Sequence, residues 1–154
     1  MTTTVKTVRL PTELAARVEE ESASVGLTFN DYAVYALERL LSNSHEPDAS
    51  FPFLRQLAKW TGETYGGKPF PNTVTLEVFH HIRDTKDLRE AYDRLLANDV
   101  DRQAIRSLHR RIGLMVKRVL NAKVEGRSAP RDPRKDLVTT FSYLAPAKPG
   151  EEEA

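Results

Sequence analysis

The N-terminal part of the chain opens with alternating polar and apolar positions that predict one short strand. Residues 4–10, Thr-Val-Lys-Thr-Val-Arg-Leu, are rich in β-branched side chains, which favour strands. Because successive strand residues point to opposite faces, Val8 and Leu10 share one face, and Thr7 and Arg9 share the other. The pattern is that of a strand buried on one face only.

Two amphipathic helices are predicted after this strand, up to residue 44. Pro11 suits the first position of a helix, and Gly26 favours the left-handed conformation that closes one. Thr28 and Asp31 match a capping box in its shorter-acid form, so a second helix is predicted to begin near Phe29. The side chains that recur at helical spacing and should face inward are Leu14, Val18 and Val25 in the first helix and Tyr32, Ala33, Ala36, Leu37, Leu40 and Leu41 in the second.

A strand and two short helices cannot form a stable unit alone. A single strand leaves its backbone N–H and C=O groups unpaired, and a segment of this length buries too little apolar surface. Antiparallel pairing of two copies removes both problems. In such a dimer Val8 and Leu10 would close a shared four-helix core, while Thr7 and Arg9 would remain on the exposed face of the two-stranded ribbon.

The residues Val8-Arg9-Leu10-Pro11-Thr12-Glu13-Leu14, followed by Gly26-Leu27-Thr28 and an amphipathic second helix, resemble the Arc/MetJ/CopG ribbon-helix-helix family. The resemblance covers residues 3–43. It implies an intertwined homodimer whose ribbon enters the major groove of double-stranded DNA, where each base pair displays a distinct hydrogen-bonding pattern.

The resemblance also assigns roles to side chains of the strand. It implies that Thr7 and Arg9 read bases, and an arginine can bond guanine O6 and N7 together. Val5 is the third outward position, where the family usually has a polar residue, so it would at most touch a thymine methyl group. Lys6 falls on the inward phase at the end of the strand and would extend to a phosphate.

The start of the second helix is a further predicted DNA contact. The resemblance implies a phosphate clamp formed by Thr28, Phe29 and Asn30, through free backbone N–H groups and two side chains, because the N-terminus of a helix attracts anions. Thr28 is equally explained as an ordinary helix cap, and the two roles are compatible.

The remaining chain is predicted to be mainly helical, so that the whole protein belongs to the mainly α class. A polar linker is expected at 45–52, a helical domain of unknown function at 53–145, and a disordered acidic tail at 146–154. The expected elements of the helical domain are a short helix from Phe53 to before Gly62, amphipathic helices near 74–83, 86–97 and 101–122, and a strand or short helix at 137–144.

The charge of the chain is distributed unevenly although its net value is only +1. Residues 1–44 carry four basic and six acidic side chains, whereas residues 102–135 carry eleven basic and two acidic ones. The helix predicted at 101–122 has a basic side opposite its apolar stripe, formed by Arg106, Arg110, Arg111, Lys117 and Arg118. This side is interpreted as a further DNA contact, as a surface for an acidic protein partner, or as an ordinary solvated face.

Several function classes lose support from the composition. The chain has no cysteine, which excludes disulfides, thiolate nucleophiles and cysteine-ligated metals. Gly66-Gly67-Lys68 lacks the spacing of a phosphate-binding loop, and the adjacent His80 and His81 cannot form a metal pair separated by one helical turn. No Ser, His and Asp set stands out, so we expect no enzyme activity, cofactor or metal.

The hydropathy pattern also bears on location. The chain has no apolar run of about 18 residues and its first residues do not resemble a secretory signal. We therefore expect a cytoplasmic protein without a membrane partner.

Together these patterns predict a sequence-specific transcriptional regulator that binds DNA as a homodimer, with higher oligomers on DNA and a protein partner of the C-terminal domain as further possibilities. An accessory DNA-binding factor of plasmid partition or conjugative transfer, or an antitoxin, is the alternative.

Overall fold

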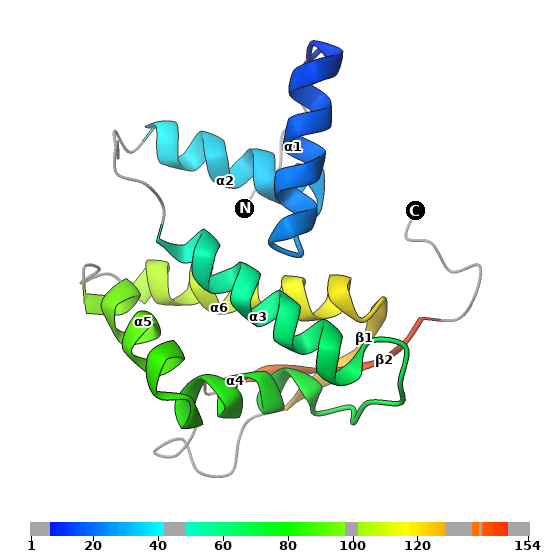
Figure 1. The fold of residues 1–154 in the computed structure, drawn as a ribbon, viewed down its shortest axis with the longest axis vertical. Helices are drawn as coiled ribbons and strands as arrows, with labels where there is room; N and C mark the ends of the chain where they lie inside the picture. The colour runs from blue at the N-terminus through cyan, green and yellow to red at the C-terminus, as the bar shows by residue number, and fades with distance from the viewer. Residues whose placement is uncertain (1–6, 42–48, 98–101, 129–136, 139, 148–154) are drawn as a thin grey trace.

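The computed structural model describes residues 7–41, 49–97, 102–128, 137–138 and 140–147 of the 154-residue chain. Within these residues the chain is mainly helical, as predicted, and adds one antiparallel pair of strands (Figure 1). The elements are α1 (Thr12–Ser24), α2 (Phe29–Leu41), α3 (Ser50–Tyr65), α4 (Val74–Asp84), α5 (Lys86–Ala97), α6 (Arg102–Val119), β1 (Ala122–Ser128) and β2 (Phe141–Pro146).

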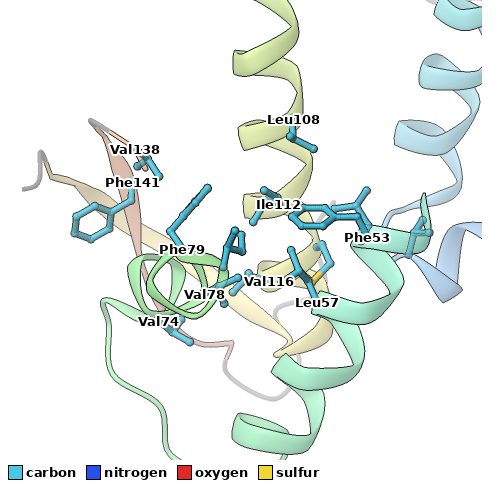
Figure 2. Packing of buried hydrophobic residues seen from close by; sticks show 14 of the residues in the cluster. Phe53, Leu57, Val74, Val78, Phe79, Leu108, Ile112, Val116, Val138 and Phe141 are labelled. Carbon is cyan, nitrogen blue, oxygen red and sulfur yellow. The ribbon is translucent and has the colours of Figure 1, made fainter. Parts of the chain in front are cut away.

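The core lies between α3, α4, α5, α6 and the strand pair (Figure 2). Leu57 of α3, Val78 of α4 and Ile112 and Val116 of α6 are fully buried and point toward one another. Within each helix the buried apolar residues recur at helical spacing, so each helix buries one stripe of its surface. No helix in the described ranges is long and apolar enough to cross a membrane.

The end of α6 differs from the prediction. The helix expected to reach residue 122 stops at Val119, because Asn121 adopts a left-handed conformation with φ 46°, which asparagine tolerates better than most residues. The chain then enters β1, a segment for which the sequence predicted no strand. β1 is a strand because β2 supplies the hydrogen-bonding partner.

The segment expected at 137–144 to be a strand or a short helix provides that partner as a strand, β2. Ala122 pairs with Pro146 and Ser128 with Phe141, and the register shifts between Val124 and Gly126. Leu144 also donates its backbone N–H to the carbonyl of Asn72 at 2.9 Å, so the strand pair is fixed to the loop that precedes α4.

The N-terminal strand is not found in the single chain. Residues 1–6 lie outside the described part, and residues 7–10 form no strand; the two strands lie within residues 122–146. The physical reason is that a strand exists only with a hydrogen-bonding partner, and the single chain offers residues 7–10 none. The arrangement of a ribbon followed by two helices is therefore absent from the isolated chain.

The boundaries of the two helices and of the linker are close to those predicted. Pro11 caps α1, which begins at Thr12, and α2 begins at Phe29 as its capping pattern predicted. α3 begins at Ser50, inside the predicted linker, while residues 42–48 lie outside the described part. Pro146 ends β2, and the rest of the predicted tail beyond Ala147 also lies outside it.

Candidate nucleic-acid interface

An apolar surface on α1, α2 and the residues before them has no partner in the single chain. Seven of the eight large hydrophobic side chains that are exposed in the described residues lie there: Val8, Leu10, Leu14, Val34, Leu37, Leu40 and Leu41. We call these seven residues the apolar face. Leu40 and Leu41 are 73% and 82% exposed, although the sequence predicted both to face a core.

The opposite side of α2 packs on the rest of the chain. Tyr32 stacks on Phe51 of α3 with ring centroids 5.2 Å apart, and Tyr35 meets the same ring edge-on at 5.1 Å. The guanidinium of Arg111 lies 4.5 Å from the centre of the Tyr35 ring, and its Nη1 donates to Ser50 Oγ at 2.7 Å. Helix α2 therefore has one side bound to α3 and α6 and another side exposed.

The turn between α1 and α2 is buried against α6. Val25 and Leu27 are 0% and 2% exposed. Gly26 has φ +69°, and a Cβ atom built on it would lie 2.6 Å from Met115 Cγ and 3.2 Å from Val119 Cγ2. Glycine is required here both by the left-handed backbone and by this close approach of the turn to α6.

A second contact joins α1 to α3. Arg55 Nε donates to Ser24 Oγ at 3.0 Å, and its guanidinium forms an ion pair with Glu21. All three side chains are exposed, so this pair adds little stability by itself. Together with the buried turn, it places the α1–α2 unit against α3 and α6 (Figure 1).

The predicted base-reading residues lie at the free end of this unit. Thr7 and Arg9 are exposed, and within the described residues 7–10 make no backbone hydrogen bond. Val5 and Lys6, the other predicted strand contacts, lie outside the described residues.

The start of α2 contains the predicted cap and the predicted phosphate-binding residues. The Asp31 backbone N–H donates to Thr28 Oγ1 at 3.1 Å, and the Thr28 hydroxyl donates to Asp31 Oδ2 at 2.7 Å. Thr28 and Asn30 are exposed and Phe29 is half-buried. These bonds confirm that Thr28 has the ordinary role of a helix cap. They also hold the Asp31 carboxylate at the start of α2.

The five basic residues predicted along α6 do not form one surface. Arg111 is held between Tyr35 and Ser50, as described above. Arg106, Arg110 and Arg118 are exposed, and Lys117 is half-buried. At about 100° per residue, Arg118 lies about 60° around the helix from Met115, whereas Arg110 lies about 140° away. By this projection Arg118 lies nearer to the side of the α1–α2 turn than Arg106, Arg110 and Lys117, which project to the far side.

Two histidines of the described part, His81 and His109, take part in packing. His81 stacks on Trp60 with ring centroids 3.8 Å apart. His109 Nε2 lies 2.8 Å from Tyr92 Oη, and burial lowers the pKa of His109 and raises the pKa of Tyr92 to about 12. No group of three or more metal-binding side chains occurs among the described residues.

A hollow of about 450 Å³ lies between α3 and α5. Its lining is mostly apolar, with Phe53 at its base and Gln56 and Arg94 as the polar side chains. These residues supply no pair of acid and base for catalysis.

The contact between the Arg111 guanidinium and the Tyr35 ring was missed by the reasoning from sequence. The sequence placed Arg111 opposite the apolar stripe of α6, and this placement is wrong: at about 100° per residue Arg111 lies about 40° from buried Met115, and it packs against Tyr35 and Ser50. The sequence does contain a signal that another part of the chain packs here. Tyr35 and Leu27 lie outside the exposed apolar face, and they give the α1–α2 unit a second apolar side.

Comparison with known proteins gave no match: no family model, no curated protein and no solved structure is detectably similar to this chain.

Proposed function

We propose that the chain is a sequence-specific DNA-binding protein, acting as a transcriptional regulator, whose homodimer places a two-stranded ribbon from residues 4–10 in the major groove. The observation that carries the proposal is the exposed apolar face. It includes Val8 and Leu10, which lie in a segment, residues 7–10, whose backbone makes no hydrogen bond within the described residues. A second copy of the chain supplies both missing partners at once, a strand for the ribbon and an apolar surface for the helices.

The exposure of the apolar face supports a protein partner over solvent. Leu37, Leu40 and Leu41 are 57%, 73% and 82% exposed, and burying a leucine side chain fully contributes about 1.5–3 kcal/mol. Val34, Leu37 and Leu41 project to one side of α2 at about 100° per residue, and exposed apolar side chains that gather in this way mark interaction sites. A second copy is favoured because antiparallel pairing of identical strands is self-complementary and forms a closed two-fold dimer.

The readout of DNA would rest on the opposite face of the ribbon. Thr7 and Arg9 occupy that face in the predicted strand, and both are exposed. An arginine that bonds guanine O6 and N7 discriminates against other bases by about 1–3 kcal/mol. The dimer would therefore recognise a DNA site with two-fold symmetry and a guanine in each half.

Dimer formation is tested by sedimentation equilibrium of Leu37→Lys. Val124→Lys is a matched control, because Val124 on β1 is 53% exposed and lies outside the apolar face. We expect Leu37→Lys to shift the protein to monomer and Val124→Lys to leave the parent dimer unchanged. A parent that is monomeric at all concentrations would contradict the proposal.

DNA recognition is tested by selecting bound sequences from random duplexes and measuring affinity for the selected site by fluorescence anisotropy. Arg9→Ala removes the bidentate contact from both half-sites, so it should weaken binding by about 2–6 kcal/mol, or roughly 30- to 20,000-fold, and should relax the guanine preference. Arg17→Ala, which removes an exposed arginine of α1, should keep that preference. Equal affinity and selectivity of Arg9→Ala and the parent would refute readout by the ribbon.

Footprinting at nucleotide resolution in cells would then show which DNA is bound. Protection at promoters is expected for a regulator, whereas protection confined to a transfer origin or a partition site would assign the accessory role.

A further inference from the structure

The α1–α2 unit lacks the positive charge needed to hold DNA. Residues 7–41 carry three arginines and six acidic side chains, and the Asp31 carboxylate lies at the start of α2. Binding to DNA depends on neutralising phosphates with lysine and arginine. Basic residues from elsewhere in the chain would therefore strengthen DNA binding if they lie close to this unit.

The contact between the α1–α2 turn and α6 decides which basic residues these are. Gly26 lies against Met115 and Val119, at the C-terminal end of α6. Arg118 stands between these two positions in the sequence, about 60° from Met115 and about 100° from Val119 around the helix axis. Its side chain is exposed and makes no ion pair or hydrogen bond within the described part of the chain.

We propose that Arg118 contacts the DNA backbone, so that the C-terminal end of α6 forms a second DNA-binding surface next to the α1–α2 turn. This inference rests on the proposed function, because it places Arg118 beside DNA that the ribbon holds. It identifies the partner of this surface as phosphate groups, which an arginine binds well because its planar guanidinium offers several donors.

The dimensions of the unit agree with this placement. α1 has 13 residues and is therefore about 20 Å long at 1.5 Å per residue, whereas the major groove is about 12 Å wide. A turn at the far end of α1 can thus reach past the edge of a groove that holds the ribbon. Gly26 and Thr28 are two residues apart, or at most about 7 Å, which keeps the start of α2 close to the same end of α6.

The same helix provides matched controls. Arg106 and Arg110 are also exposed and without ion pairs among the described residues. They lie about 180° and 140° from Met115 around the axis and about 12–18 Å from Arg118 along it. These two arginines have the same chemistry and similar exposure but face away from the α1–α2 unit, so we expect them to contribute little to DNA binding.

The test measures affinity of the full chain for its selected DNA site by fluorescence anisotropy between 50 and 200 mM salt. Each phosphate contact contributes about 0.9 to the slope of log affinity against log salt. A dimer has two copies of Arg118, so Arg118→Gln should reduce the slope by about 1.8 and the affinity at 0.1 M salt by one to two orders of magnitude. Arg118→Lys should keep most of the slope, and the sequence preference should not change.

The outcomes separate this inference from the proposed function. If Arg118→Gln keeps the parent slope while Arg9→Ala weakens binding, the function stands and the inference is wrong. If Arg106→Gln or Arg110→Gln reduces the slope instead, the far side of α6 faces DNA and the inference is equally wrong. If the parent binds no DNA duplex at all, both fail. Circular dichroism and urea midpoints equal to those of the parent would show that each variant is folded.

Discussion

Replacement of Gly26 by alanine should destabilise the protein for two separable reasons. Gly26 has φ +69°, and an alanine in the left-handed region costs about 1–2 kcal/mol. Its new Cβ would also lie 2.6 Å from Met115 Cγ and 3.2 Å from Met115 Cα. Because crowding a packed interface costs about 1–3 kcal/mol, we expect Gly26→Ala to lower the free energy of unfolding by about 2–5 kcal/mol.

Gly67→Ala is the control for the backbone part of this loss. Gly67 has φ +67°, but a Cβ built on it meets nothing within 4 Å. Its replacement should therefore cost only the backbone strain of about 1–2 kcal/mol. The difference between the two variants measures how closely the α1–α2 turn packs on α6.

The assay is urea unfolding, followed by circular dichroism at one fixed protein concentration because a dimer is more stable at higher concentration. The midpoint should fall more for Gly26→Ala than for Gly67→Ala, with similar slopes against urea. In a Met115→Ala background the extra loss should shrink, since the nearest crowded atom is gone. Equal losses for the two glycine variants would refute the packing of the turn on α6, and with it the placement of Arg118.

Three further predictions concern single contacts. Thr28→Ala should lower the free energy of unfolding by about 1 kcal/mol, because the Asp31 N–H loses its acceptor at 3.1 Å, and Thr28→Ser should restore it in urea unfolding. A double-mutant cycle of Arg111→Gln and Tyr35→Leu should give a coupling of about 0.5–2 kcal/mol for the 4.5 Å contact between guanidinium and ring, and a coupling near zero would show that the two residues do not interact. Burial lowers the pKa of His109 below its ordinary 6.5, so the unfolded chain binds the proton first. Stability is therefore complete above pH 6.5 and falls as the pH drops through the lower pKa of the folded protein, and His109→Gln should lose part of this dependence in unfolding curves at pH 7.5 and 5.5.

The sequence determined those features that depend on neighbouring residues. The capping pair Thr28 and Asp31 predicted the start of α2, and the structure has the capping bond from the Asp31 N–H to Thr28 Oγ1, with a second bond between the two side chains. The apolar stripe of α6 was also predicted correctly, because burial on one side of a helix leaves a regular spacing. The mainly helical class follows from the same local patterns.

Tertiary structure decided the features that depend on distant partners. β1 is a strand because β2 lies beside it, and residues 7–10 are not a strand in the single chain because nothing lies beside them. The same dependence applies to single side chains. Periodicity placed Arg111 and Arg118 on one basic side of α6, but only the packing of α2 and the turn at Gly26 put Arg111 against Tyr35 and left Arg118 exposed. A helical period defines which side of an element is polar, whereas its neighbours define what that side contacts.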